Sequence, residues 1–207
     1  MKSTIFQKHA VLLSILTSVL LIVMATFLYP GGSIVDMNST GFSWKHNFIS
    51  NLFGAKAING EANPARWWAF IGMAFHSLTY TLFFNNFSKK IPNPKPASIV
   101  KYLGLINLLL IVLIATPLHD LIIPIASTTF LAGLFFITYY VIKSRHLVLK
   151  VLCVLCMLLY YFTMYVYGTH KMELLAILQK GTFIFSSTVI LSLEYYTHKK
   201  DFAHLNK

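Results

Sequence analysis

Charged side chains are scarce in this sequence, and acidic ones are the scarcest. Only 11% of the 207 residues are charged, with 6 Asp and Glu against 17 Lys and Arg. A soluble domain carries about 25% charged residues, so this composition excludes an ordinary soluble enzyme core. Because 57% of the residues are hydrophobic, it also excludes intrinsic disorder. In so apolar a chain, the net charge of +11 indicates a membrane rather than a nucleic acid as the partner.

Cysteine and the common catalytic motifs are also nearly absent. The two cysteines, Cys153 and Cys156, exclude a disulfide framework. They form a CxxC pair inside an apolar segment, which we interpret as two small buried side chains rather than a redox pair. The sequence has no Walker or dinucleotide-binding glycine pattern and no GxSxG element. Enzyme classes that depend on these motifs are therefore not indicated.

Long apolar segments fill most of what remains. A bilayer core about 30 Å thick needs about 20 apolar residues to be crossed as a helix. Six segments qualify, at 10–29, 67–87, 99–117, 121–142, 147–167 and 174–196. The first has no convincing small-x-small cleavage site, so we expect it to be retained. The sequence predicts one all-α membrane domain over residues 1–207, a bundle of six transmembrane helices.

The basic residues predict the orientation of this bundle. If the N-terminus is cytoplasmic, the inner loops and tails hold most of the Lys and Arg, namely Lys2, Lys8, Lys89, Lys90, Lys95, Lys101, Lys143, Arg145, Lys150, Lys199, Lys200 and Lys207. The outer loops hold only Lys45, Lys56, Arg66 and Lys171. Short cytoplasmic loops carry an excess of Lys and Arg, so we expect both termini in the cytoplasm. The predicted location is a bacterial inner membrane, with membrane lipids as partners.

The loop 30–66 is the longest segment outside the predicted spans. Within 41–54, helical periodicity places the polar residues in a sector of about 140°: Ser43, His46, Asn47, Ser50 and Asn51. This pattern predicts a short interfacial helix whose apolar side faces lipid or the bundle. Its polar face is either simply hydrated or part of a binding site.

Two other predicted outer turns carry ionisable residues. His119 and Asp120 follow the third span, where the carboxylate could orient the imidazole or simply cap the next helix. His170 precedes the sixth span. His46, His119 and His170 could together hold zinc, although no HExxH or HxxxH spacing organises them. We expect no cofactor and keep zinc as the alternative.

Three residues within the predicted spans are candidates for polar chemistry. His76 is near the middle of the second span, with Tyr80 one turn later, and Lys180 lies in the outer half of the sixth. Ionisable side chains at such depth face the bundle interior, water or a partner. For His76 a hydrogen-bonded packing role competes with a ligand role. Lys180 either faces the interior or extends to the outer interface.

Two short elements connect the sequence to a known pattern. They are Ser50-Asn51-Leu52-Phe53-Gly54 in the outer loop and Pro117-Leu118-His119-Asp120 after the third span. With the order of spans, they resemble the polytopic membrane family catalogued as domain of unknown function 998, and more distantly the Frag1/DRAM-type proteins. The family pattern more often has Asp where this sequence has Asn51. The resemblance implies a topology over nearly the whole chain and no established activity.

A second comparison concerns chemistry. Ser50, Asp120, His119, His170 and either His46 or His76 resemble the Ser, Asp and three His of integral-membrane ceramide-type hydrolases, which bind zinc. Those enzymes have seven spans and a His-rich last span, whereas the last span here has no histidine. Ser50, His119 and Asp120 are the catalytic candidates if the protein is an enzyme.

The leading hypothesis is a six-span protein with a polar outer pocket that binds a lipid headgroup or similar amphiphile, without an assigned activity. The residues predicted to line this pocket are His46, Ser50, Asn51, His119, Asp120, His170 and Lys180, with the Lys180 ammonium facing a phosphate. The alternatives are a metal-dependent lipid hydrolase and a small-solute transporter. A scaffold for partner helices also stays open.

Overall fold

The protein is all-helical, as the sequence predicts. The structure is a computed structural model that describes residues 5–114 and 118–205, and these residues form no β-strand. The helices are α1 (Ile5–Lys8), α2 (Ala10–Leu28), η1 (Ile49–Phe53), α3 (Arg66–Ser88), α4 (Pro94–Ile114), α5 (His119–Ile142), α6 (Leu147–Gly168), α7 (Met172–Tyr196) and η2 (Lys199–Leu205), where η marks a 3-10 helix.

Four of these helices are long and apolar enough to cross a membrane. The qualifying segments are Ala10–Leu28, Asp120–Ile142, Leu147–Gly168 and Met172–Tyr196. The helices α3 and α4 have comparable lengths of 23 and 21 residues. The composition and length of the helices are those of a membrane protein.

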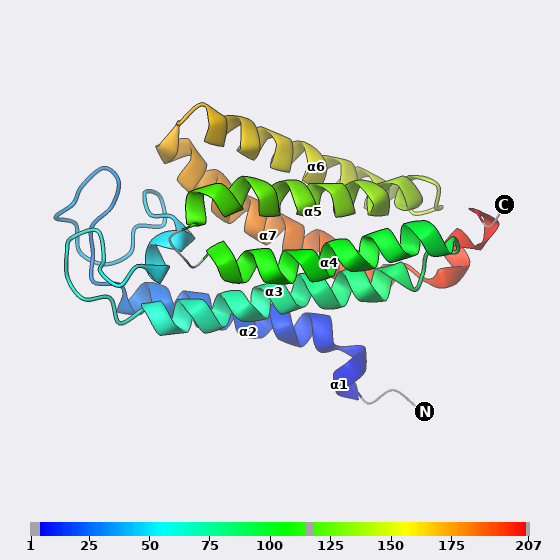
Figure 1. Ribbon diagram of the computed structural model, residues 1–207, viewed down its shortest axis with the longest axis horizontal. Helices are drawn as coiled ribbons and strands as arrows, with labels where there is room; N and C mark the ends of the chain where they lie inside the picture. The colour runs from blue at the N-terminus through cyan, green and yellow to red at the C-terminus, as the bar shows by residue number, and fades with distance from the viewer. Residues whose placement is uncertain (1–4, 115–117, 206–207) are drawn as a thin grey trace.

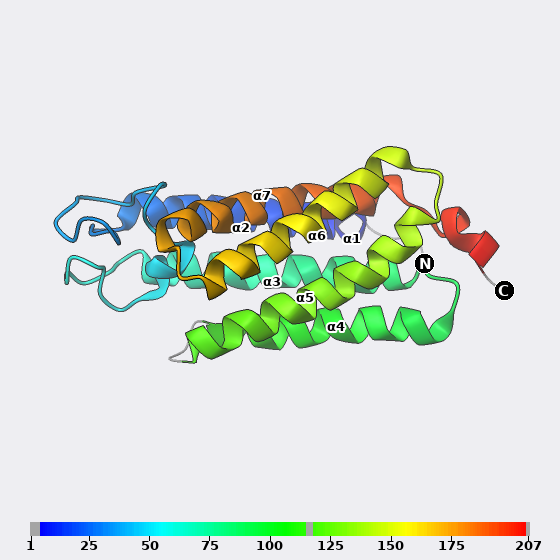
Figure 2. The same cartoon turned by 90° about the horizontal axis from the view of Figure 1, so that it is seen from above.

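The six long helices run back and forth along one axis (Figure 1). The α2–α3 connection, residues 29–65 and here called the long loop, lies at one end together with the α6–α7 turn; we call this the loop end. The helices α1 and η2 lie toward the opposite end, here called the terminal end. Figure 2 shows α5 and α6 inclined across the other helices.

Five of the long helices enclose a common interior. Contacts join α3 to α4, α4 to α5, α5 to α6, α6 to α7, and α7 back to α3. The remaining helix, α2, packs on α3 and α7 from outside this ring. The ring therefore surrounds a space that α2 does not line.

The polar residues of α3 explain why this helix is less apolar than its neighbours. His76, Ser77, Thr79 and Ser88 are all buried within the protein. The Thr79 hydroxyl also donates a hydrogen bond to the carbonyl of Phe75, four residues earlier. Polar residues on α3 thus face other helices, as expected for a helix at the centre of a bundle.

An aromatic core fills the ring toward the terminal end. Phe83, Phe84 and Phe87 of α3 are at most 1% exposed and pack with residues of α4 to α7. The side chain of Phe84 lies so close to Gly104 and Gly133 that a Cβ atom at either glycine would collide with it. These two glycines let α4 and α5 approach α3, and the core closes this part of the ring.

The structure differs from the sequence prediction at three elements. Helix α4 begins at Pro94, five residues earlier than predicted, because the first helical turn does not need the N–H that proline lacks. Residues 44–46 form a turn and only Ile49–Phe53 are helical, so 41–54 is not one continuous helix. The short helix η2, which the sequence analysis did not predict, follows α7.

Candidate functional site

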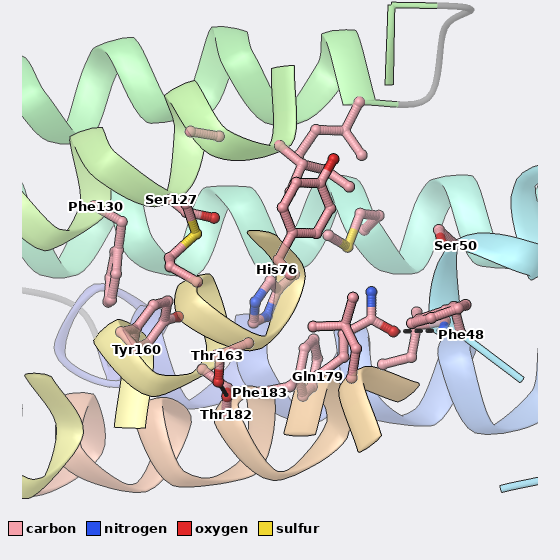
Figure 3. Close-up of a pocket in the computed structure, with 18 of the residues that line it drawn as sticks. Phe48, Ser50, His76, Ser127, Phe130, Tyr160, Thr163, Gln179, Thr182 and Phe183 are labelled. Carbon is pink, nitrogen blue, oxygen red and sulfur yellow. Dashed lines mark hydrogen bonds between the residues drawn. The ribbon is translucent and has the colours of Figure 1, made fainter. Parts of the chain in front are cut away.

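A cavity of about 410 Å³ occupies the half of the ring nearest the loop end. Helices α3 to α7 form its walls and η1 forms its roof (Figure 3). The described residues lining it are Phe48, Ile49, Ser50, Asn51, Phe53, Met73, His76, Tyr80, Asn107, Ile114, Asp120, Ile123, Ala126, Ser127, Phe130, Tyr160, Thr163, Met164, Tyr167, Met172, Leu175, Gln179, Thr182 and Phe183.

His76 lies in the cavity wall between two aromatic rings. Its imidazole stacks on Phe183, with ring centroids 4.0 Å apart and planes at 17°, and meets Tyr80 edge-on at 4.6 Å. The imidazole forms no hydrogen bond with the residues that the structure describes, although only 6% of His76 is exposed. In Figure 3 its ring reaches into the space between α3, α6 and α7. A neutral imidazole in this position offers one N–H donor and one nitrogen acceptor.

Several buried hydroxyl groups near His76 already have partners. The Tyr80 hydroxyl lies 2.7 Å from Ser186 Oγ, which in turn donates to the Phe183 carbonyl. Thr163 and Thr182 donate to backbone carbonyls of their own helices, and their oxygens lie 3.1 Å apart (Figure 3). These groups hold the helices together and leave few hydroxyl protons for a ligand.

The roof is fixed to α7 by a side-chain amide. Gln179 Oε1 accepts a hydrogen bond of 2.8 Å from the Ile49 N–H (Figure 3). Within the roof, Asn51 Oδ1 accepts from the Phe48 N–H at 2.6 Å. Gln179 therefore satisfies the N–H at the start of η1, which would otherwise have no helical partner.

Lys180, the next residue of α7, binds the long loop rather than the cavity. Its ammonium donates to the carbonyl of Asn47, at 2.7 Å, and to that of Ala176. Asn47 is itself completely buried, and its side chain bonds to Ser43 N–H and the Gly32 carbonyl. Lys180 thus provides a hydrogen-bond donor for a buried carbonyl group of the loop. It is not among the residues that line the cavity.

The predicted histidine ligands do not gather in the part of the chain that the structure describes. His46 Nδ1 lies 3.5 Å from Ser43 Oγ in the long loop, and His170 is exposed in the α6–α7 turn. His119 begins α5, but its side chain lies outside the described part. No group of three His, Cys, Asp or Glu residues able to hold a metal occurs among the described side chains. The zinc alternative stays a prediction.

Five residues singled out in the sequence line the cavity, namely Ser50, Asn51, His76, Tyr80 and Asp120. His46, His170 and Lys180 do not, and a ligand role for them stays a prediction. Ser50, His76 and Asp120 line the same cavity, but nothing in the structure tests hydrolysis, so the hydrolase alternative also stays a prediction.

Sequence reasoning missed several polar lining residues, among them Asn107, Ser127 and Gln179. Each is a single neutral residue in an apolar span, and its orientation depends on helix packing. The signal available was the presence of a carboxamide at membrane depth, since such groups need a partner there.

The cavity is almost free of formal charge. Among its described lining residues, Asp120 is the only one with a charged side chain at neutral pH, given a neutral imidazole at His76. Tyr167, another lining residue, donates its hydroxyl proton to the Asp120 carbonyl at 3.3 Å. The remaining walls are aromatic, aliphatic or neutral polar. Searches of protein-family models, curated proteins and solved structures found no match to this chain.

Proposed function

We propose that all six long helices cross the membrane, with both termini in the cytoplasm. Six alternating helices account for α1 and η2 lying at the same end of the bundle (Figure 1). The loops of the terminal end carry Lys89, Lys90 and Arg145, and Lys95 lies in the first turn of α4 at the same end. At the loop end, the basic residues are balanced by acidic ones. This asymmetry agrees with the preference of cytoplasmic loops for Lys and Arg.

We propose further that the protein binds an amphiphile in the cavity. The observation that carries this proposal is the 410 Å³ cavity itself, which lies within the size range of ligand sites, about 300–1,000 Å³. Phe130, Tyr160 and Phe183 provide apolar walls deep in the ring. Ser50 and Asn51 provide polar groups under the roof. A ligand with one apolar and one polar part matches this division.

This proposal differs from the sequence hypothesis in the residues that it assigns to the ligand. It retains Ser50, Asn51 and Asp120 and adds His76 and Gln179, which lie in the wall. It does not assign Lys180, because that ammonium already donates to the carbonyls of Asn47 and Ala176.

The test fills the cavity with an indole. Ala126 lines the cavity on α5 and is 5% exposed, whereas Thr128, two residues later, is exposed. We expect Ala126→Trp to abolish binding of an amphiphile and Thr128→Trp to leave it unchanged. The measurement is native mass spectrometry of the purified protein, scored by lipid adducts that persist after detergent exchange. Equal lipid retention by the two variants, or no retained lipid in the wild type, would refute the proposal.

A further inference from the structure

We infer that the ligand of the cavity is an uncharged lipid whose polar part carries carbonyl oxygens. This inference rests on the proposed amphiphile binding and adds the chemical class of the ligand. It follows from comparing the hydrogen-bond donors in the cavity wall with the acceptors, and from the near absence of charge there.

The charges in the wall disfavour an anionic headgroup. Asp120 is the only formally charged side chain among the described lining residues, and it would repel a phosphate. The nearby cation, Lys180, already donates to two carbonyls. Transfer of an unpaired charge into an apolar site is strongly unfavourable. A ligand that lies deep in this cavity is therefore electrically neutral.

Three polar groups in the wall have N–H donors without a described acceptor. Asn107 is 3% exposed, and its Nδ2 has no hydrogen-bond partner among the residues that the structure describes. Gln179 uses Oε1 to accept from Ile49, which leaves its amide N–H groups without a described acceptor. The imidazole N–H of His76 also has no described acceptor. A buried donor without a partner is unfavourable, and Asn107 Nδ2 is such a donor. Together with the N–H groups of Gln179 and His76, it favours a ligand that supplies acceptors.

Three hydroxyl groups deep in the ring are engaged with other partners and do not supply those acceptors. Thr163 and Thr182 each donate to a backbone carbonyl, and Tyr80 is paired with Ser186. Their arrangement leaves the two carboxamides and the imidazole as the groups that need an acceptor. A carbonyl oxygen accepts two hydrogen bonds without carrying a charge, and it meets this need.

Two lipid classes supply such oxygens, the quinones and the esters of acylglycerols. Tilted and edge-on rings line the cavity: the ring centroid of Phe130 lies 4.8 Å from that of Tyr160 and 4.9 Å from that of Tyr80. These rings accommodate either a flat quinone head or an acyl chain. The shared chemistry is the neutral carbonyl, and separate probes distinguish the two sources.

The experiment measures the affinity of the full chain, in detergent, for matched pairs of probes. Decylubiquinone is compared with decylbenzene, and 1,2-dioctanoylglycerol with 1,2-di-O-octylglycerol, which has ethers in place of esters. We expect at least one carbonyl probe to bind about tenfold more tightly than its carbonyl-free analogue. Dioctanoyl phosphatidic acid and a decyltrimethylammonium salt test for an anionic and a cationic ligand.

Two variants test the donors. His76→Phe keeps the stack on Phe183 but removes the N–H, and Asn107→Leu removes the orphaned amide. Each should weaken binding of the preferred carbonyl probe about tenfold and leave the carbonyl-free analogue unaffected. His198→Phe, at an exposed position beyond α7, is the matched control and should change nothing. If His76→Phe does not fold, the wild-type pairs and Asn107→Leu still decide the question.

The outcomes separate the two proposals. If none of the probes binds the wild type, amphiphile binding itself is refuted. If the carbonyl-free, anionic or cationic probes bind as tightly as the carbonyl probes, the inference is overturned and amphiphile binding stands. Preference for decylubiquinone alone or for dioctanoylglycerol alone supports the inference and identifies the source of the carbonyl.

Discussion

At residue 180, a lysine ammonium lies buried beside the long loop, where two backbone carbonyls replace its water. The Asn47 carbonyl that it contacts belongs to a residue with no exposed surface. A buried charge is tolerated only when hydrogen bonds compensate for its lost hydration. The long loop and α7 are thus joined through one side chain. Gln179 adds a second connection at the adjacent position.

We predict that Lys180→Met loosens the long loop. The substitution leaves the Asn47 carbonyl without its partner, at a cost of about 1–3 kcal/mol. Chymotrypsin cleavage within the long loop should become about tenfold faster, because cleavage follows the population of the open loop. Lys171→Met, at an exposed residue of the same end, is the control. Equal cleavage rates for wild type and Lys180→Met would contradict this role.

A second residue-scale prediction concerns the close approach of α5 to α3. A Cβ atom at Gly133 would collide with the Phe84 ring, whereas one at Gly181 would meet no atom within 4 Å. We expect Gly133→Ala to lower the free energy of unfolding by about 1–3 kcal/mol through overpacking. Gly181→Ala should leave stability unchanged or raise it slightly, since alanine favours a helix. Thermal unfolding in detergent measures both, and similar melting temperatures would disprove the packing argument.

Among the elements, η2 shows how a short segment is held at the terminal end. Phe202 has no exposed surface and packs against Phe87 and Tyr140. Asp201 beside it accepts from the His198 N–H at 2.7 Å and lies 3.4 Å from His146 Nε2. Burial raises the pKa of this carboxyl group, but the His198 N–H and the His146 side chain outweigh burial, so the pKa lies below its ordinary value of 3.8.

We predict that acid releases η2 from the bundle. A carboxyl group whose pKa is lowered by folding stabilises the fold above its ordinary pKa, and this contribution is lost as the pH falls through the folded value. Hydrogen-exchange protection of residues 199–205, corrected for intrinsic rates, should fall several-fold between pH 5 and pH 3. Asp201→Asn should give low protection at both values. Asp36→Asn, in the long loop, should behave as the wild type, and an unchanged profile in Asp201→Asn would exclude this origin.

The helices also show what the sequence can and cannot predict about elements. The positions and lengths of the apolar segments predicted the long helices well, and α6 begins at the predicted Leu147. The predicted third span begins only at residue 99, yet α4 begins at Pro94, because proline is accommodated in the first turn of a helix. The helix η2 was missed because one buried aromatic side chain, Phe202, fixes it through tertiary contacts. Periodicity within seven residues contains no such information.

On the scale of the molecule, the six-span proposal predicts which loops are accessible from outside the cell. Cys153 and Cys156 are at most 1% exposed, so the wild type should give almost no background with a membrane-impermeant maleimide. In intact cells, Lys56→Cys should react at once, whereas Arg145→Cys should react only after permeabilisation. Lys171→Cys and Lys95→Cys should repeat these two patterns for the other loops. Reaction of Arg145→Cys in intact cells would overturn the proposed topology.

The candidate site was predictable in part. Ser50, Asn51 and Asp120 were recognised as polar residues of connections, and His76 as an ionisable group at membrane depth. Their gathering around one cavity depends on the ring of helices and could not be read from spacing. Lys180 shows the same limit, because its partner carbonyl is 133 residues away in the chain.

The ring of helices α3 to α7 is completed only at the end of synthesis, because α7 is the last long helix to be made. Tyr80 and its partner Ser186 are 106 residues apart, and Phe183, on which His76 stacks, is on the same late helix. Translation at about 5–20 residues per second separates their emergence by roughly 5–20 s. During this interval α3 has its polar face but not the helix that satisfies it. The nascent chain therefore needs a temporary hydrogen-bond partner for Tyr80, supplied by the insertion machinery or by water, until α7 completes the ring.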